Sequence, residues 1–129
     1  MKELSVVVPV LNEAGNIEPL LEEIHSALEG GFDFEVLYVD DGSRDATPRD
    51  LAAARRRFPR LRVLTHRQTC GQSAALRTGV AAASGLWIAT LDGDGQNDPA
   101  DIPRLLTTAR EGATNGKPLL VAGYRRKRQ

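Results

Sequence analysis

The chain has 129 residues, of which 41% are hydrophobic and 26% are charged. This length fits one domain, and the composition is that of an ordinary globular protein rather than a disordered, collagenous or coiled-coil chain. Lys and Arg together number 17, as do Asp and Glu, so charge gives no reason to expect nucleic acid as a partner. The single cysteine, Cys70, excludes an internal disulfide and argues against a cluster of thiolate metal ligands.

No apolar run approaches the roughly 18 residues that a membrane helix needs. The first residues also lack the charged and then apolar segments of a signal peptide. We therefore expect a cytoplasmic protein. The one shift in composition is the basic end, from Arg125 to Gln129, for which the simplest interpretation is a solvated tail.

Apolar and polar runs alternate along the chain in the way that strands alternate with helices. Leu4 to Val10 is a β-branched apolar run, which is typical of a strand covered on both faces. After it, Asn16 is a candidate cap for a helix whose apolar residues recur every three or four positions up to Leu28. Gly30 and Gly31 then end that helix.

The rest of the chain continues this alternation. The further expected strands are Phe34 to Val39, Arg62 to Thr65, Leu86 to Leu91 and Leu119 to Gly123. One expected helix begins at Thr47-Pro48, and the others are Ser73 to Ala83 and Asp101 to Ala109. This order predicts an α/β fold with an open, mostly parallel sheet and helices on both faces.

Acidic residues collect directly after three of the expected strands. Ligands of open α/β sheets bind beyond the carboxyl ends of the strands, so these residues should share one edge. The polar candidates there are Asn12, Glu13, Asp40, Asp41, Asp45, Asp92, Asp94 and Asp98, with Pro9 before them. Close carboxylates repel one another unless a cation compensates. Oxygen ligands favour Mg²⁺, Mn²⁺ or Ca²⁺ over zinc or copper, so the pattern predicts a site for a hard divalent cation.

Asp92 and Asp94 form the most informative of these motifs. Residues two apart in an extended segment point the same way, so both carboxylates can hold one metal ion while Gly93 lets the backbone bend closely around it. The spacing does not fit an EF-hand, a Walker phosphate loop or a glycine-rich dinucleotide fingerprint. Any bound nucleotide would therefore be held through carboxylates and a metal.

Four segments resemble motifs of the inverting family 2 glycosyltransferases, and most closely those of the dolichol-phosphate and polyprenyl-phosphate mannosyl- and glucosyltransferases. The segments are Val7 to Glu13, Val39 to Asp45, Gly71 to Gly79 and Asp92 to Gln96. The resemblance implies a Rossmann-like nucleotide-binding fold of the GT-A type. It also implies Mg²⁺- or Mn²⁺-dependent transfer of a hexose, from a donor such as GDP-mannose or UDP-glucose, to a polyprenyl or dolichyl phosphate.

The resemblance further implies roles for particular residues. The residues that would line the nucleotide pocket are Pro9, Val10, Asn12, Glu13, Val39, Asp40 and Asp41. The last three of these would contact the base and the ribose. Asp92 and Asp94 would hold the divalent ion between the two phosphates of the sugar nucleotide. Gly93 and Gln96 would lie beside the sugar, and Arg125 would lie near the phosphates.

Members of this family run well beyond this length, and their catalytic base lies after the fifth strand. We therefore expect residues 1–129 to form a single nucleotide-sugar-binding domain that is truncated on its acceptor side, with the base beyond Gln129. The full enzyme would use a lipid phosphate as acceptor. A membrane segment after the fifth strand would place it at the cytoplasmic face of a membrane, and a homo-oligomer remains open.

Two alternatives remain. A nucleotide-sugar-binding module without transferase activity would keep the same motifs. A receiver domain of a signalling protein is also a five-stranded α/β unit, in which Asp40, Asp41 and Asp92 could imitate the acidic and phosphorylated residues. A receiver, however, has its acidic pair after the first strand and a Lys at the end of the fifth, where this chain has Arg125 after Gly123-Tyr124.

Three reactive side chains fall outside these motifs. We expect His25 to lie on a helix face and His66 in a loop at the end of a strand. Cys70 precedes a helix but has no partner in the sequence pattern, so we expect an inert thiol.

Overall fold

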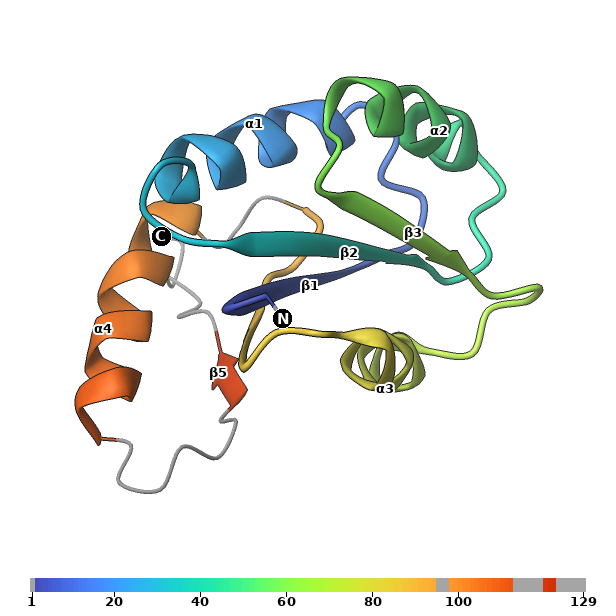
Figure 1. The fold of residues 1–129 in the computed structure, drawn as a ribbon. Helices are drawn as coiled ribbons and strands as arrows, with labels where there is room; N and C mark the ends of the chain where they lie inside the picture. The colour runs from blue at the N-terminus through green and yellow to red at the C-terminus, as the bar shows by residue number, and fades with distance from the viewer. Residues whose placement is uncertain (1, 95–97, 113–119, 123–129) are drawn as a thin grey trace, which may run out of the picture.

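The computed structural model describes residues 2–94, 98–112 and 120–122, and these form the expected α/β fold (Figure 1). The strands are β1 (Leu4–Val10), β2 (Phe34–Asp40), β3 (Leu61–Thr65), β4 (Trp87–Thr90) and β5 (Leu120–Ala122). They make one sheet in the order β3-β2-β1-β4-β5, and all four pairings are parallel. The helices are α1 (Ile17–Leu28), α2 (Thr47–Arg57), α3 (Gln72–Ala82), the 3-10 turn η1 (Pro99–Asp101) and α4 (Ile102–Gly112).

Helices cover both faces of the sheet, which confirms that part of the prediction. Helices α1 and α2 lie on one face and α3 lies on the other (Figure 1). Helix α1 contacts both α2 and α4, whereas α3 contacts β1 and β2. Among the described helices, none combines the length and apolar character that crossing a bilayer requires.

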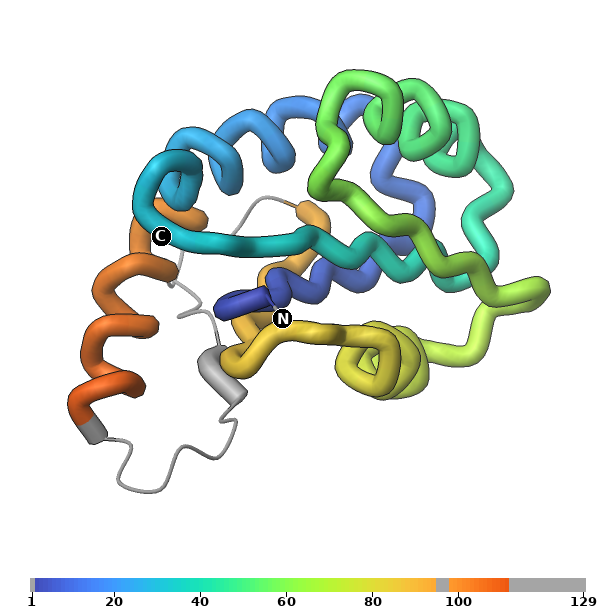
Figure 2. The backbone as a smooth tube through the Cα atoms, viewed as in Figure 1, coloured from blue at the N-terminus to red at the C-terminus, as the bar shows by residue number. Residues whose placement is uncertain are grey.

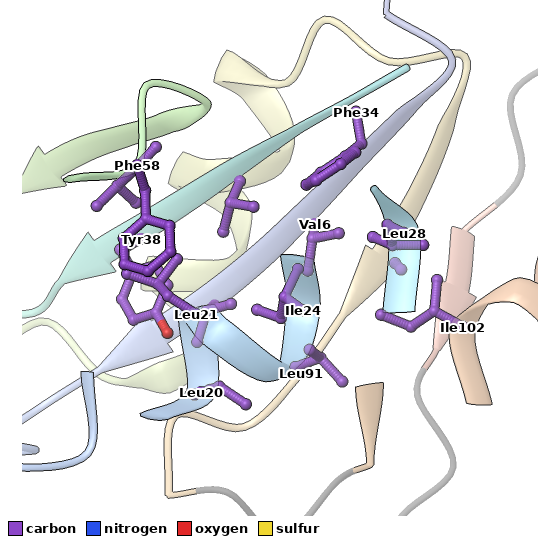
Figure 3. Packing of buried hydrophobic residues seen from close by; sticks show 14 of the residues in the cluster. Val6, Leu20, Leu21, Ile24, Leu28, Phe34, Tyr38, Phe58, Leu91 and Ile102 are labelled. Carbon is purple, nitrogen blue, oxygen red and sulfur yellow. The ribbon is translucent and has the colours of Figure 1, made fainter. Parts of the chain in front are cut away.

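The larger core lies between α1 and the sheet. Side chains alternate between the faces of a strand, so Leu4, Val6, Val8 and Val10 share one face of β1. They pack against the apolar stripe of α1, which consists of Ile17, Leu20, Leu21, Ile24 and Leu28 (Figure 3). All of these side chains are buried, which explains why the first strand and first helix were recognisable from periodicity.

A glycine sets the spacing between the sheet and α3 on the opposite face. A Cβ atom added to Gly79 would overlap Val7 and lie 3.1 Å from Val39 Cγ2. Helix α3 therefore packs closely over β1 and β2, and it holds the loop before it near the carboxyl ends of these strands.

Two local expectations differ from the structure. Asn16 does not cap α1 through its side chain, because its backbone has helical angles (φ −102°, ψ −3°) instead of the extended angles of a cap. Its Nδ2 donates to Glu13 Oε1 at 2.9 Å. The segment expected to begin α4 at Asp101 first makes the turn η1, whose preceding residue, Asp98, accepts from Ala100 N at 3.0 Å.

The strand order reverses between β1 and β4. The chain passes from β1 outward to β2 and β3, and then returns to the other side of β1 to form β4. The loops that follow β1, β2 and β3 lie at the same end of the sheet (Figure 2). A reversal of this kind leaves a crevice at the carboxyl ends of the two strands, where open α/β sheets bind their ligands.

Candidate functional site

A cavity of about 240 Å³ opens at this reversal point. Its walls come from the ends of β1, β2 and β4 and from the start of α3. The lining residues are Pro9, Val10, Leu11, Glu13, Asp41, Thr69, Gly71, Gln72, Ala75, Asp92, Gly93 and Asp94. The structure therefore brings together seven of the residues singled out in the sequence: Pro9, Val10, Glu13, Asp41, Asp92, Gly93 and Asp94.

The other candidates do not line the cavity or lie outside the described residues. Val39 and Asp40 are buried, and Asp40 Oδ1 accepts from Ser43 N at 3.0 Å. Asn12 is exposed, and its Oδ1 accepts from Arg44 N at 2.9 Å. Gln96 and Arg125 fall outside the described residues.

The loop after β1 is held in place by the loop after β2 and the start of α2. The backbone N–H groups of residues 12–15 donate to four side chains, which are Ser43, Thr47, Asp45 and Asp50. Hydrogen bonds from Thr47 outweigh the small effect of burial and lower the pKa of Asp45, so this acid stays ionised while it shapes the loop. Asp45 therefore has a structural task at the strand edge, and Glu13 is presented to the cavity by a fixed backbone.

Asp41 is held firmly in the wall of the cavity. It is 3% exposed, and its Oδ1 accepts from His66 Nδ1 and from Cys70 N, both at 2.8 Å. Oδ2 accepts from Gly71 N at 2.9 Å. Burial alone would raise the pKa of Asp41, but these hydrogen bonds outweigh burial and hold the pKa below its usual value. Asp41 is thus an ionised carboxylate of fixed orientation in the cavity wall.

His66 was not recognised as part of this site, and the structure places it at the centre of the support for Asp41. Its Nε2 lies 2.8 Å from Thr78 Oγ1 on α3, so the ring bridges Asp41 and the helix. An ionised carboxylate only accepts hydrogen bonds, so Nδ1 carries the proton that Asp41 receives. The sequence positions of the two residues could have indicated this contact, because Asp41 follows β2 and His66 follows β3, and these strands are neighbours in the sheet.

The backbone of Cys70 was also missed. The expectation of an inert thiol concerned the side chain, whereas the Cys70 N–H donates to Asp41. Gly71 follows with a φ of 102°, a left-handed value that favours glycine, and its own N–H donates to the same carboxylate. The segment before α3 therefore wraps around Asp41 through its backbone.

Asp92 and Asp94 also line the cavity, in the loop after β4, which lies on the other side of β1 from β2. Asp92 is half-buried and its Oδ1 accepts from Gln72 Nε2 at 3.2 Å, while Asp94 is exposed. Gly93 between them is buried, and a Cβ there would overlap Val10 Cγ1 and lie 3.0 Å from Pro9 O. The glycine thus lets the acidic loop approach the end of β1, as the spacing of the motif indicates.

Four acidic residues that follow three different strands line the cavity, namely Glu13, Asp41, Asp92 and Asp94. The charge of Asp41 is compensated by short hydrogen bonds from His66, Cys70 N and Gly71 N. Like charges around one small space favour a bound cation, and an all-oxygen donor set suits Mg²⁺ or Mn²⁺. Asp92 and Asp94 therefore fit the divalent ion that their spacing indicates.

Comparison with known proteins relates this arrangement to a family. The family model described as glycosyl transferase family 2 matches residues 5–118. A dodecaprenyl-phosphate galacturonate synthase from Rhizobium johnstonii is 39% identical over 132 residues, which cover 98% of this chain and 37% of that protein. An undecaprenyl-phosphate 4-deoxy-4-formamido-L-arabinose transferase from Pseudomonas aeruginosa is 41% identical over 111 residues, which cover 84% of this chain and 33% of that protein. The chain thus spans about a third of the length of these relatives.

Solved structures agree with the family at the level of the fold. A mannosyltransferase from Pyrobaculum calidifontis, in complex with GDP-Man and Mn²⁺, superimposes with a TM-score of 0.66 and 29% identity. The match covers 72% of this chain and 28% of that one. The same findings exclude the receiver-domain alternative. With its four motifs, its GT-A-type sheet and a family match across almost all of its length, the chain belongs to glycosyltransferase family 2.

Proposed function

We propose that the cavity binds the nucleotide part of a nucleoside diphosphate sugar together with a divalent cation. The observation that carries this proposal is the division of the cavity between two kinds of acid. Asp41, after β2, is ionised and held by hydrogen bonds, whereas Asp92 and Asp94, after β4, are two residues apart in sequence. The base and ribose would lie toward Asp41, and the diphosphate would lie toward Asp92 and Asp94.

Asp41 is suited to recognise a base that presents an N–H group. Its carboxylate accepts three hydrogen bonds from the residues that the structure describes, and an ionised carboxylate has about four acceptor positions. The remaining capacity can serve a ligand in the cavity that Asp41 lines. Uracil and guanine both carry a ring N–H, so either nucleotide fits this chemistry.

Asp92 and Asp94 would hold Mg²⁺ or Mn²⁺ at the diphosphate. A cation bound there would stabilise the charge that builds on the leaving diphosphate as the glycosidic bond breaks. Gly93 would keep the loop close to Pro9 and Val10, which bounds the space left for the nucleotide. The proposal keeps Gln96 beside the sugar and Arg125 near the phosphates, as the family motifs imply.

The acceptor in the proposal is a polyprenyl phosphate. The names of both curated relatives contain such a lipid, with galacturonate or 4-deoxy-4-formamido-L-arabinose as the sugar. The solved relative with GDP-Man and Mn²⁺ supports a nucleotide-activated donor and a divalent ion. We propose inverting transfer of a hexose from a GDP- or UDP-activated donor, at the cytoplasmic face of a membrane, with the catalytic base beyond Gln129. Residues 1–129 supply the donor-binding domain.

Calorimetry of the 129-residue chain with UDP, GDP and their sugar derivatives tests the proposal. We expect binding with Mn²⁺ and at least tenfold weaker binding in a chelator. Asp92→Asn and Asp94→Asn should reproduce that loss in the presence of Mn²⁺. Asp98→Asn is the matched control, because Asp98 follows the same loop, does not line the cavity and accepts from Ala100 N. Equal affinity in the chelator, or normal titrations for both variants, would contradict the proposal.

A further inference from the structure

A second set of side chains that could bind a metal lies around Asp41, which lines the cavity. Asp41, His66 and Cys70 each offer one ligand atom, and these atoms all lie within 4.8 Å of one another. The set combines a carboxylate oxygen, an imidazole nitrogen and a thiol sulfur. Such a mixture is typical of zinc sites, whereas the oxygen set of Asp92 and Asp94 suits Mg²⁺ or Mn²⁺.

We propose that Asp41, His66 and Cys70 form an exchangeable site for Zn²⁺ or a similar thiophilic ion. Three protein ligands leave a fourth, open position, as in zinc sites that bind water or an exchangeable ligand. Asp41 is buried and His66 is partly buried, while Cys70 is exposed. Solvent therefore reaches the site from the Cys70 side.

The neighbours of these ligands already hold them as the outer partners of a metal site do. Metal-ligating histidines and carboxylates in proteins are oriented by hydrogen bonds from a second layer of groups. Thr78 Oγ1 holds His66 Nε2 at 2.8 Å, which leaves Nδ1 directed to Asp41. Gly71 N holds Asp41 Oδ2 at 2.9 Å, so the carboxylate keeps its direction when Oδ1 changes partner.

Binding of the ion replaces the hydrogen bond between His66 and Asp41 by one bond from each of these residues to the ion. Without an ion, His66 Nδ1 donates to Asp41 Oδ1 at 2.8 Å. With an ion, Nδ1 becomes a ligand, the ring proton moves to Nε2 and donates to Thr78 Oγ1, and the thiol proton of Cys70 is released to solvent. The charge of the divalent ion is then balanced by the Asp41 carboxylate and the Cys70 thiolate.

Cys70 is the ligand that has to move. Bond lengths of about 2.0–2.3 Å to zinc bring tetrahedral ligand atoms to within about 3.3–3.6 Å of one another. Because the ligand atoms all lie within 4.8 Å of one another, the required closure is at most about 1.5 Å. The thiol is exposed and bonds to Gln68 O at 3.2 Å, so rotation of this side chain can supply the movement.

An ion at this site would change the wall of the cavity, because Asp41 lines it. The following consequence rests on the proposed function. If Asp41 receives the base, the ion and the nucleotide compete for the same carboxylate, and zinc acts as an inhibitor of donor binding. Occupation of the Asp92 and Asp94 site by Mg²⁺ would not produce this competition.

Titration of the chain with Co²⁺ alone tests the site, because a cobalt–thiolate bond gives a charge-transfer absorption. We expect an absorption that saturates at one equivalent and is removed by one equivalent of Zn²⁺. Cys70→Ser should abolish it, and this exposed position allows the variant to fold. His66→Gln should weaken formation of the cobalt–thiolate band at least tenfold, while His25→Gln, which lies outside both proposed sites, should leave the band unchanged. An absent band, or a band that His66→Gln does not alter, would overturn the proposal.

A second titration separates this site from the proposed function. Addition of UDP or GDP with Mg²⁺ should reduce the cobalt–thiolate band in proportion to nucleotide bound. If the band forms and nucleotide binds without reducing it, the competition is overturned and the metal site stands. If the band is absent while Mn²⁺-dependent nucleotide binding is normal, the metal site is overturned and the proposed function stands.

Discussion

Two buried carboxylates lie at opposite ends of the same strand and have different roles. Glu35 is the second residue of β2, and Asp41 directly follows the strand. They are 4% and 3% exposed. Glu35 accepts from Ser5 Oγ at 2.6 Å, from Ser84 N at 2.7 Å, from Ser84 Oγ at 2.8 Å and from Arg62 Nη1 at 3.0 Å.

The pKa values of the two groups do not distinguish them. In Glu35, as in Asp41, burial would raise the pKa, and the hydrogen bonds, which in Glu35 come from Ser5, Ser84 and Arg62, outweigh burial and lower it. A groove also borders Glu35, together with Arg60 and Arg62. A low pKa and a hollow surface therefore do not identify a binding acid by themselves.

The kind of partner and the position in the fold do distinguish the two carboxylates. Glu35 accepts three hydrogen bonds from Ser5 and Ser84 at Oε2 and a fourth, at Oε1, from the cation of Arg62. Asp41 accepts three hydrogen bonds from the described residues and lines the cavity at the carboxyl ends of the strands. Glu35 joins the amino ends of β1 and β2 to the segment before β4, whereas Asp41 is held in the wall of the cavity, where we propose that it receives the base.

The largest expected effect on stability is that of Glu35→Gln. The amide would point a donor at the Ser84 N–H or at Arg62, and the loss should be about 2–3 kcal/mol of unfolding free energy. Urea denaturation measures it, and nucleotide affinity should be unchanged. Glu29→Gln is the matched control, because the exposed pair of Glu29 with Arg60 contributes about 0–1 kcal/mol. Equal losses for the two variants would contradict a structural role for Glu35.

Asp41→Asn should show the opposite pattern. Two backbone N–H groups and His66 would face a neutral amide, and stability should fall by about 1–2 kcal/mol. A charged acceptor for the base would also be lost, so nucleotide affinity should fall about 10- to 100-fold. Calorimetry and urea denaturation of the same sample measure both. A variant with reduced stability and normal affinity would place Asp41 with Glu35 among the structural acids.

Acid should destabilise the fold through both residues. The folded pKa of each lies below the ordinary value, 4.5 for Glu35 and 3.8 for Asp41, so the unfolded chain takes up protons first as the pH falls. The stability that these two carboxylates contribute is fully present above the ordinary pKa values. It is lost progressively as the pH falls from there through the folded pKa values. Urea midpoints from pH 7 down to pH 3 should show this decline, and it should be shallower in Glu35→Gln. Parallel curves would contradict the assignment.

The smallest expected effect is that of Thr78→Val. This change removes the hydroxyl that holds His66 Nε2, while both backbone N–H groups still hold Asp41. Nucleotide affinity should fall about two- to fivefold, consistent with one hydrogen bond of about 0.5–1 kcal/mol. A loss as large as that of Asp41→Asn would show that His66 dominates the orientation of the carboxylate.

The sequence predicts the parts of this molecule that depend on local pattern. The apolar run of β1 and the periodic stripe of α1 are visible because burial requires them. Asp92 and Asp94 are visible because a parallel sheet brings strand ends to one edge. They reach the cavity because β4 lies beside β1 in the sheet and because Gly93 lets their loop approach the end of β1.

Contacts between distant loops were not predictable in the same way. The bond from His66 to Asp41 joins residues 25 apart, and it depends on the path of the loop between β3 and α3. Glu35 lies inside an apolar strand, and its partners Ser5 and Ser84 carry no motif that links them to it. Asn16 has the residue type of a helix cap, yet its side chain binds Glu13 because its backbone is already helical.

The most direct test compares the two ends of β2 in one spectrum. Backbone N–H signals of Cys70 and Gly71 report on Asp41, and those of Ser84 and Gly85 report on the network of Glu35 and Ser5. A nitrogen-labelled sample titrated with UDP or GDP and Mg²⁺ should shift the Cys70 and Gly71 signals with saturation and leave those of Ser84 and Gly85 in place. Saturating shifts confined to Ser84 and Gly85, or none at Cys70 and Gly71, would contradict a nucleotide site at the carboxyl ends of the strands.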